Sequence, residues 1–172
     1  HMNDPDPKLT MAGPDGTRYY YILPSFFALV QHLHNTQRDF SIVIRTYGMD
    51  APNVLECIRY SFEGRHPRFK DNPLPYKVNT EPGKISRVGD KITLQHMENG
   101  HAQFYTSEQE IYKFLSKSEG VTGYVDDFMH WQDNDYHFKA GKPHWIDPSD
   151  KDVHHIFFDD NLRITDDDSI VN

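Results

Sequence analysis

Hydrophobic positions in the first third of the chain predict a helix, a strand and a second helix, in that order. Over residues 24–33 the apolar residues recur at helical spacing, and Pro24 suits the first position of a helix. Residues 40–46 are β-branched or otherwise apolar at nearly every position, which is typical of a strand covered on both faces. Residues 50–62 again carry an apolar stripe at helical spacing. This alternation of helix and strand indicates an α/β fold.

A small β-meander is predicted in the middle of the chain, after a long polar segment. Residues 64–82 are rich in Pro, Arg, Lys and Asn, which marks a long connection or an insertion into the α/β layout. Asn99-Gly100 is a strong signal for a two-residue hairpin turn, and Gly89-Asp90 marks a second turn. The three strand-like segments that these turns separate are residues 85–88, 91–97 and 101–105. We therefore expect the connection and the meander to form one insertion at about residues 64–106.

Two further helices and a loop are expected after the meander. Ser107 and Glu110 form a capping box, which predicts a helix that continues to about Lys117. Residues 124–131 are interpreted as another short helix, and residues 142–148 as a structured loop.

A buried strand that ends in two carboxylates is predicted near the end of the chain. Residues 154–158 form a short, largely apolar run, and Asp159 and Asp160 follow it directly. Open α/β sheets place their ligand sites at the carboxyl ends of their strands. Paired carboxylates are hard oxygen ligands that suit Mg²⁺ and the phosphate chemistry that Mg²⁺ assists. The alternative is an ordinary turn, because Asp and Asn favour turns.

The start of the chain is expected to lie outside the folded domain. Residues 3–18 contain several Pro and Gly residues among polar ones, so we interpret residues 1–18 as a flexible tail. His1-Met2 is typical of a cloning remnant, which leaves open whether the natural protein extends upstream. The remaining residues, 19–172, fit a single domain with a substantial core.

Composition narrows the classes of partner and compartment. The formal net charge is -8, which argues against a general nucleic-acid binder because such proteins carry clustered Lys and Arg. The apolar runs are all shorter than the roughly 20 residues that a membrane span needs. Cys57 is the only cysteine, so an internal disulfide is excluded, and we interpret it as a small core residue. We expect an intracellular, cytoplasmic protein with no nucleic-acid or membrane partner.

Three short motifs occur in an order that resembles the haloacid dehalogenase-like (HAD) superfamily. The matching segments are Ile42-Val43-Ile44-Arg45-Thr46, Gly141-Lys142-Pro143 and Ile156-Phe157-Phe158-Asp159-Asp160-Asn161. The resemblance implies a Rossmannoid parallel sheet flanked by helices, here with the small β-meander inserted. It also implies that the Thr46 hydroxyl binds a phosphoryl oxygen, that Lys142 neutralises charge near the nucleophile, and that Asp159 and Asp160 hold Mg²⁺. Such fixed donors and cations suit phosphoryl transfer.

Each motif also has an ordinary structural explanation. A threonine that closes a strand can be there for its β-propensity, and a lysine in a loop is usually a solvated surface residue. Histidine pairs invite a zinc interpretation, but the members of each pair, His32 with His34 and His154 with His155, point to different faces of their elements. His130, His137 and His144 could converge only through tertiary folding, which the sequence does not reveal.

The first motif of the superfamily is missing from its usual place. That motif is an apolar strand ending in Asp-x-Asp, whose first Asp forms an aspartyl-phosphate, and nothing before Thr46 has this form. Asp4 and Asp6 have the spacing, but prolines interrupt them and no apolar strand precedes them. Asp166-Asp167-Asp168 lies in the wrong part of the chain and is better interpreted as a turn. The resemblance therefore implies a nucleophile that is absent or outside this chain.

Two functions of different classes remain open. The first is an HAD-like domain related to Mg²⁺-dependent phosphohydrolases, acting on a phosphorylated small molecule or a phosphoprotein if an upstream Asp completes it. The second is a noncatalytic binding or scaffold module that keeps the HAD-like architecture. A natural upstream strand ending in Asp-x-Asp would favour the enzyme. Substrate choice is expected to lie in the meander and in residues 64–82.

Overall fold

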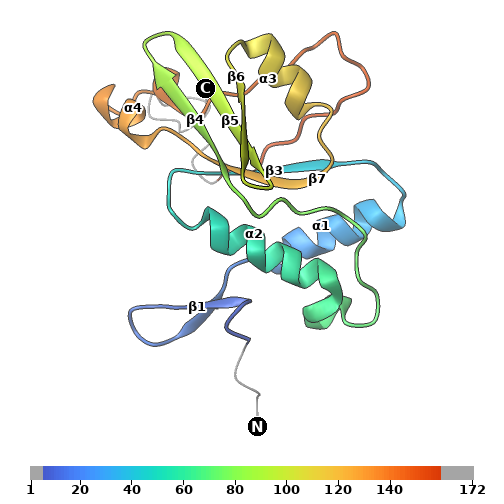
Figure 1. Ribbon diagram of the computed structural model, residues 1–172. Helices are drawn as coiled ribbons and strands as arrows, with labels where there is room; N and C mark the ends of the chain where they lie inside the picture. Colours follow the sequence, from blue (N-terminus) through green and yellow to red (C-terminus); the bar gives the residue numbers. More distant parts are fainter. Residues whose placement is uncertain (1–5, 160–172) are drawn as a thin grey trace. The chain divides into compact units, whose positions relative to one another are not determined.

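The computed structural model describes residues 6–159, and these divide into two compact units. The first unit contains residues 6–82 together with 119–123, and the second contains residues 83–118 and 124–159. Figure 1 shows the course of the chain. The protein is mixed α/β, with a five-stranded sheet of order β3-β7-β4-β5-β6 and a separate two-stranded sheet. Strand β7, Gly120–Val125, contributes residues to both units.

The first unit begins with a hairpin where a flexible tail was expected. Strands β1, Thr10–Ala12, and β2, Arg18–Tyr20, pair in antiparallel register, with Thr10 opposite Tyr20. The residues between them form a tight turn: the Asp15 carboxylate accepts hydrogen bonds from the backbone and hydroxyl of Thr17. Part of the segment interpreted as a flexible tail therefore forms a hairpin, because Gly and Pro mark hairpin turns as well as flexible segments.

The predicted helix, strand and helix are confirmed and enclose the core of the first unit. They are α1, Pro24–Asn35; β3, Ser41–Thr46; and α2, Ala51–Tyr60. A π-helical turn, η1 at Ser61–Arg65, and a 3-10 turn, η2 at Pro67–Phe69, follow α2. The core cluster consists of Phe27, Val30, Leu55, Ile58, Phe62, Phe69, Leu74 and Val121. Each large apolar side chain buried there stabilises the fold by about 1.5–3 kcal/mol.

The polar segment over residues 64–82 is a connection that runs beside β7. The backbone N–H of Val121 donates to the carbonyl of Lys77, and that of Asn79 donates to the carbonyl of Val121. Gly120 has a positive φ of 76°, and a Cβ atom there would lie 2.2 Å from the Lys77 carbonyl oxygen. Only glycine fits this close approach without displacing the backbone. The connection therefore fixes the start of β7 by direct backbone contact.

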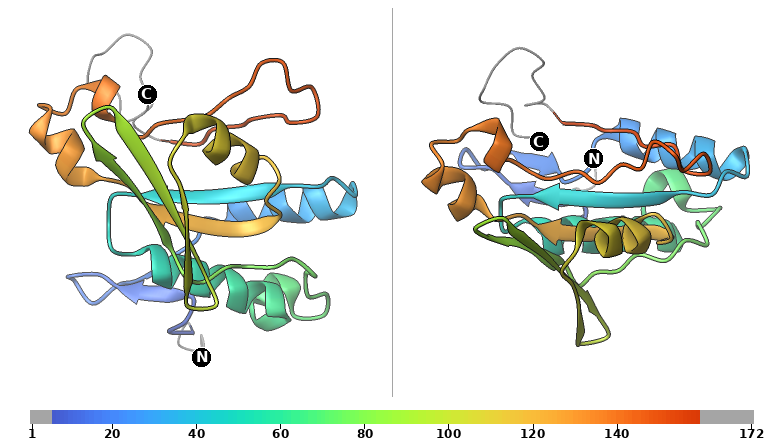
Figure 2. Two further views of the ribbon diagram at one scale, coloured as in Figure 1. Left: turned by 45° about the horizontal axis from the view of Figure 1, so that its top comes forward. Right: turned by 90° about the horizontal axis from the view of Figure 1, so that it is seen from above.

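The second unit contains the predicted β-meander. Its strands are β4, Gly83–Val88; β5, Lys91–Glu98; and β6, His101–Tyr105, and both neighbouring pairs are antiparallel. Asn99 and Gly100 both have positive φ, as the predicted two-residue turn requires. Helix α3, Glu108–Leu115, begins at the predicted capping box, and Phe114 stacks on Tyr105 of β6. Figure 2 shows the three strands and α3 from two further directions.

The expected parallel sheet is not what forms. Strand β4 pairs in parallel with β7 through Gly83–Tyr124 and Lys84–Val125, whereas β4, β5 and β6 are antiparallel. The sheet is therefore mixed, and the meander is continuous with it. The expectation of a parallel sheet carrying a separate insertion was wrong in this respect, because the hairpin signals gave the local pairing but not the partner of β4.

Two expectations for the last third of the chain were also wrong. Tyr124 and Val125 belong to β7, and the helix expected there is α4, Phe128–Asp133, followed by a 3-10 turn, η3 at Phe138–Ala140. Residues 153–159 form no strand, and Ile156 and Phe158 are 64% and 79% exposed. An apolar run alone does not make a strand, because its backbone needs a pairing partner. Within residues 6–159, no helix is both long enough and apolar enough to cross a membrane.

Candidate functional site

Two of the residues predicted from the sequence meet in the second unit. The ammonium Nζ of Lys142 lies 3.2 Å from Oδ2 of Asp159, and their side chains are 9% and 14% exposed. An ion pair this buried loses much of its hydration, and the attraction between its charges offsets that loss only when the geometry is good. Such a pair is therefore weak evidence for stability.

Lys142 is positioned by the short turn that precedes it. The imidazole of His137 accepts a hydrogen bond from the backbone of Lys139, and the backbone N–H of Gly141 donates to the carbonyl of Phe138. This closes η3, after which the chain extends and Gly141, Lys142 and Pro143 are buried. Hydrogen bonds within the preceding turn therefore fix the backbone from which the Lys142 side chain extends. This agrees with the structured loop that was expected over residues 142–148.

Asp159 reaches Lys142 at the end of an extended segment that runs without strand pairing. The ring of Phe157 packs edge-on against His144, with ring centroids 3.6 Å apart. His155 lies beside Tyr112, with centroids 6.0 Å apart. These ring contacts hold the segment in place where backbone pairing was expected. Asp160, the second predicted metal ligand, lies outside the described residues.

Thr46 ends β3 in the first unit, as predicted. Its Oγ1 donates to Oδ1 of Asp50 at 3.1 Å and accepts the backbone N–H of Gly48 at 2.8 Å. These bonds shape the turn between β3 and α2. Of the three predicted positions, Lys142 and Asp159 are in contact within one unit, and Thr46 belongs to the other.

Magnesium ligation is incomplete among the described residues. Mg²⁺ prefers six oxygen ligands, and over residues 6–159 no group of three or more His, Cys, Asp or Glu is placed to hold a metal ion. Asp159 is the one predicted metal ligand in that range, and it contacts a lysine ammonium, which would repel a neighbouring cation. These residues by themselves therefore do not make a magnesium site.

A second carboxylate pair, which sequence reasoning missed, follows β7. Asp126 is 4% exposed, and Asp127 accepts hydrogen bonds from the backbones of Arg87 and His130 at 3.1 Å each. Asp127 thereby caps α4 and ties it to β4. The available signal was the run Val121 to Val125, which is β-branched and aromatic except for one glycine.

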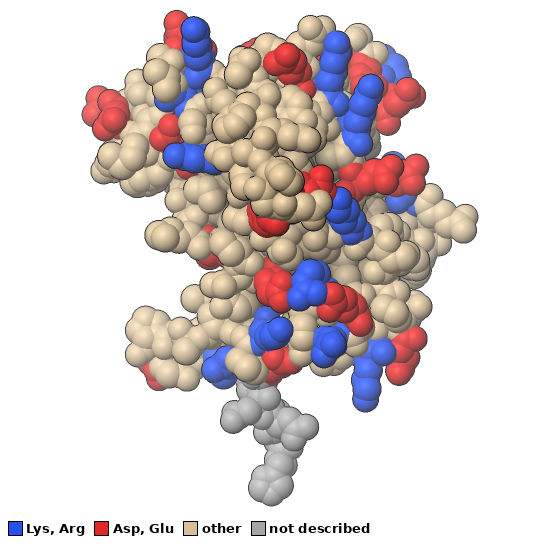
Figure 3. Space-filling view, viewed as in Figure 1, with Lys and Arg blue, Asp and Glu red and all other residues tan. Residues whose placement is uncertain are grey.

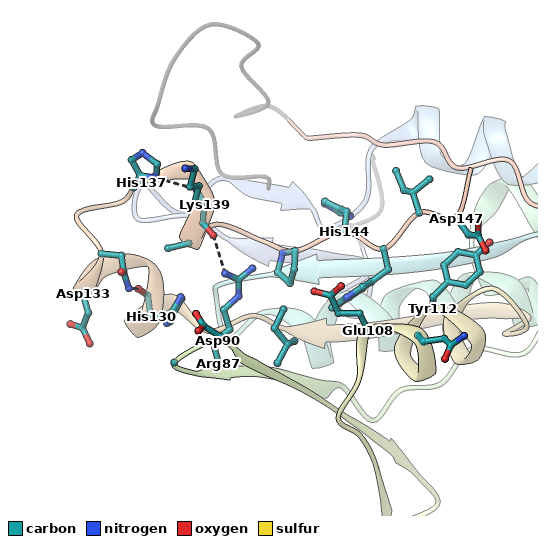
Figure 4. Close-up of a pocket in the computed structure, with 18 of the residues that line it drawn as sticks. Arg87, Asp90, Glu108, Tyr112, His130, Asp133, His137, Lys139, His144 and Asp147 are labelled. Atoms are coloured by element: carbon teal, nitrogen blue, oxygen red, sulfur yellow. Dashed lines mark hydrogen bonds between the residues drawn. The ribbon is translucent and has the colours of Figure 1, made fainter. Parts of the chain in front are cut away.

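A groove crosses the second unit between α3 and the α4–η3 region (Figure 4). Its volume is about 1430 Å³, and its lining comes from the β4–β5 turn, α3, α4, η3 and residues 143–148. His130, His137 and His144, whose convergence the sequence left open, all line it. Arg87 donates from Nη1 to the Lys139 carbonyl at 3.0 Å, which joins β4 to η3 across one end of the groove.

Tyr112 marks the other end of this groove. Its hydroxyl donates to Oδ2 of Asp150 at 2.8 Å. Burial, followed by the hydrogen bond to Asp150, raises the pKa of Tyr112 to about 12. The Tyr112 phenol therefore stays neutral at physiological pH. Its hydrogen bond to Asp150 fixes the position of the Tyr112 ring in the lining of the groove.

Cys57 has no place in either site. It is buried in α2, as predicted, and burial raises the pKa of its thiol to about 11. The reactive thiolate is therefore scarce at neutral pH, which argues against a nucleophilic role.

Charge is mixed on the face of the molecule drawn in Figure 3, where Lys and Arg are interspersed with Asp and Glu.

Comparisons with protein-family models, with curated proteins and with solved structures find no match.

Proposed function

We propose that this chain carries a phosphate-binding site centred on Lys142, in an HAD-like domain related to Mg²⁺-dependent phosphohydrolases. The observation that carries the proposal is the buried contact between Lys142 and Asp159, 3.2 Å from Nζ to Oδ2. It joins the third and fourth motifs of the resemblance through two residues that lie 17 positions apart in the sequence.

The chemistry of the pair supports this role. A lysine ammonium binds phosphate as a compact point charge, and its flexible side chain must be held in place before it can do so selectively. Asp159 supplies that restraint. In the low dielectric around two buried side chains the ammonium attracts an anion more strongly and the carboxylate repels it more strongly, so a phosphate would bind Lys142 on the side away from Asp159. The ligand class that follows is a phosphomonoester, on a small molecule or on a protein.

Catalysis by these residues alone is not part of the proposal. Lys142 can polarise a phosphoryl group and Asp159 can orient Lys142, but neither forms the covalent intermediate that the superfamily uses. By the resemblance, Thr46 would donate its hydroxyl to a phosphoryl oxygen, and Asp160 would join Asp159 in holding Mg²⁺. Both roles are predictions, and substitution of Thr46 or Asp160 would test them.

Phosphate binding can be measured as a shift in the thermal unfolding midpoint, with chloride at equal ionic strength as reference. We expect inorganic phosphate and phosphoserine to stabilise the wild type, because a ligand that binds only the folded state raises its stability. Lys142→Met should abolish the shift. Lys151→Met removes an exposed lysine whose ammonium donates to the Pro148 carbonyl, and it should leave the shift intact.

Misfolding of the single variant must be separated from loss of binding. The double variant Lys142→Met/Asp159→Leu removes the unpaired charge and should regain stability while still failing to bind phosphate. A phosphate shift that persists in either Lys142 variant would contradict the proposal.

A noncatalytic binding module is the second candidate function. The observation that favours it is the groove of the second unit, whose lining residues do not include Lys142 or Asp159. Such a module would bind its partner with or without phosphate and with or without the Lys142–Asp159 pair.

A further inference from the structure

Carboxylates outnumber cations along the groove of the second unit. Arg87 and Lys139 are its permanently charged cations, and the three histidines add charge only when protonated. The acidic residues that line it are Asp90, Glu108, Asp133, Asp135 and Asp147. The groove therefore attracts cations and repels the phosphate backbone of a nucleic acid.

The two cationic residues of the groove lie together at one of its ends. The Arg87 guanidinium donates to the carbonyl of Lys139, and the backbone of Lys139 donates to His137 (Figure 4). These contacts hold the Arg87 guanidinium and the Lys139 backbone at the end formed by η3, where the Lys139 ammonium lies 6.0 Å from the centre of the Phe138 ring. The rest of the groove is consequently more acidic than the overall count suggests.

The volume of the groove and the distribution of its carboxylates favour an elongated ligand. Ordinary small-molecule pockets enclose about 300–1,000 Å³ and are mostly apolar. This groove encloses about 1430 Å³, and Figure 4 shows Asp90, Glu108 and Asp147 in succession from its α4 end to its α3 end. Over the described residues these carboxylates do not gather into a metal-binding group. A chain with several separate positive charges matches this arrangement better than one compact ion.

Aromatic and apolar residues complete the lining. Tyr112 and Trp145 both line the groove, and the Tyr112 ring is fixed by its hydrogen bond to Asp150. Aromatic rings attract Lys and Arg side chains through cation–π contacts, each contributing about 0.5–1 kcal/mol at exposed sites. Pro143, Ile146 and Pro148 add apolar surface on which the methylene stems of such side chains can lie.

We infer that this groove binds an extended peptide segment rich in lysine and arginine. The partner is a basic segment of another protein, and its positive side chains pair with the row of carboxylates while its stems pack on the aromatic and proline surface. This inference is independent of the proposed phosphate site, because neither Lys142 nor Asp159 lines the groove.

Fluorescence anisotropy of dye-labelled peptides tests the inference with the full chain. A Lys- and Arg-rich peptide in a Gly-Ser background should bind, and a peptide of equal length with Asp and Glu in those places should not. Raising the salt concentration should weaken binding, because the pairing is between exposed charges. The double variant Glu108→Gln/Asp147→Asn should lower affinity about threefold to tenfold.

Matched controls separate the groove from general acidity. Asp71→Asn/Asp152→Asn removes two exposed carboxylates outside the groove and should leave affinity unchanged. Asp90→Asn/Asp133→Asn removes two carboxylates at the opposite end of the groove and should weaken binding as much as Glu108→Gln/Asp147→Asn does. With two independent groove variants, misfolding of one does not invalidate the test. Full affinity in both groove variants, or equal binding of the acidic peptide, would overturn the inference. Displacement of the peptide by a linear polyamine of equal affinity would also overturn it, in favour of a small cationic ligand.

Discussion

Lys142 and Asp159 form an ion pair that connects the turn after η3 to the extended segment at the end of the described chain. The Nζ–Oδ2 distance is 3.2 Å, and little of either side chain reaches solvent. Removing one of the two charges should therefore lower the stability of the fold, whereas removing both should restore most of it.

Asp159→Asn should destabilise the fold by about 3 kcal/mol, because it leaves the Lys142 ammonium buried without its carboxylate. Lys142→Met/Asp159→Leu should recover most of that loss, since it replaces two desolvated charges with apolar groups. Urea unfolding of the two variants and the wild type measures both effects. A double variant as unstable as the single one would show that the pair is a net source of stability.

The chain should show no appreciable hydrolysis of p-nitrophenyl phosphate in the presence of Mg²⁺. The proposed HAD-like domain would need an Asp nucleophile that the sequence before Thr46 does not offer, and Lys142 and Asp159 can orient and polarise a phosphate but cannot divide the reaction into two easier steps. Steady-state release of p-nitrophenol measures turnover in the wild type and in Asp159→Ala. Robust hydrolysis abolished by that substitution would reveal a nucleophile within this chain, with Asp166 and Asp168 the first residues to test.

Mg²⁺ should bind only weakly. Asp159 and Asp160 supply an incomplete set of oxygens for an ion that favours six ligands, and Lys142 opposes a cation beside Asp159. Titration calorimetry with MgCl₂ measures the affinity, and removing the metal with a chelator should leave the unfolding midpoint unchanged. Tight stoichiometric binding that is lost only in a histidine variant would instead support a zinc site.

Gly120→Ala should destabilise the first unit by about 3 kcal/mol or more. The new Cβ would combine a positive φ with a 2.2 Å approach to the Lys77 carbonyl. Gly100→Ala is the matched control, because Gly100 has a similar φ of 74° and no atom would lie within 4 Å of a Cβ at that position. That control should cost only about 1–2 kcal/mol. Equal losses in urea unfolding would mean that the contact with Lys77 relaxes freely.

Alkaline pH should weaken the fold through Tyr112. Its pKa is raised from 10.0 to about 12 in the folded protein, so folding favours the protonated phenol. This contribution is complete below the unfolded pKa and is lost as pH rises from there through the folded value. Tyr112→Phe lacks this contribution and should show less loss of stability over that window than the wild type. An unchanged pH dependence in that variant would assign the loss to other groups.

Local signals in the sequence were sufficient for much of the fold. The capping box at Ser107, the Asn99-Gly100 turn and the helical spacing after Pro24 are interactions between residues close in sequence, and each gave the correct element. Strand β7 was not recognised because Gly120 and Gly123 weaken its strand pattern. These glycines are explained by distant contacts: Gly120 passes the Lys77 backbone, and a Cβ on Gly123 would lie 2.9 Å from Leu55.

Only the part of the candidate site that lies in the quoted motifs could be predicted from the sequence. The resemblance brought Lys142 and Asp159 to attention, and the two are in contact, but the strand expected to present Asp159 does not form. The groove was not predictable, because His130, His137 and His144 come from a helix, a 3-10 turn and a loop. Their even spacing of seven residues would place them on one face of a continuous helix, but no such helix forms, so the spacing does not explain why they line one groove.

The first unit is discontinuous in sequence, because it needs residues 119–123 to complete its sheet beside β3. During synthesis on the ribosome, α1, β3 and α2 emerge well before the strand that covers Leu55. At roughly 5–20 residues per second, the residues from 83 to 123 take roughly 2–8 s to appear. For that interval the apolar surface of α2 lacks its β7 neighbour, which makes this half-finished unit the stage of biogenesis most exposed to chaperone binding or aggregation.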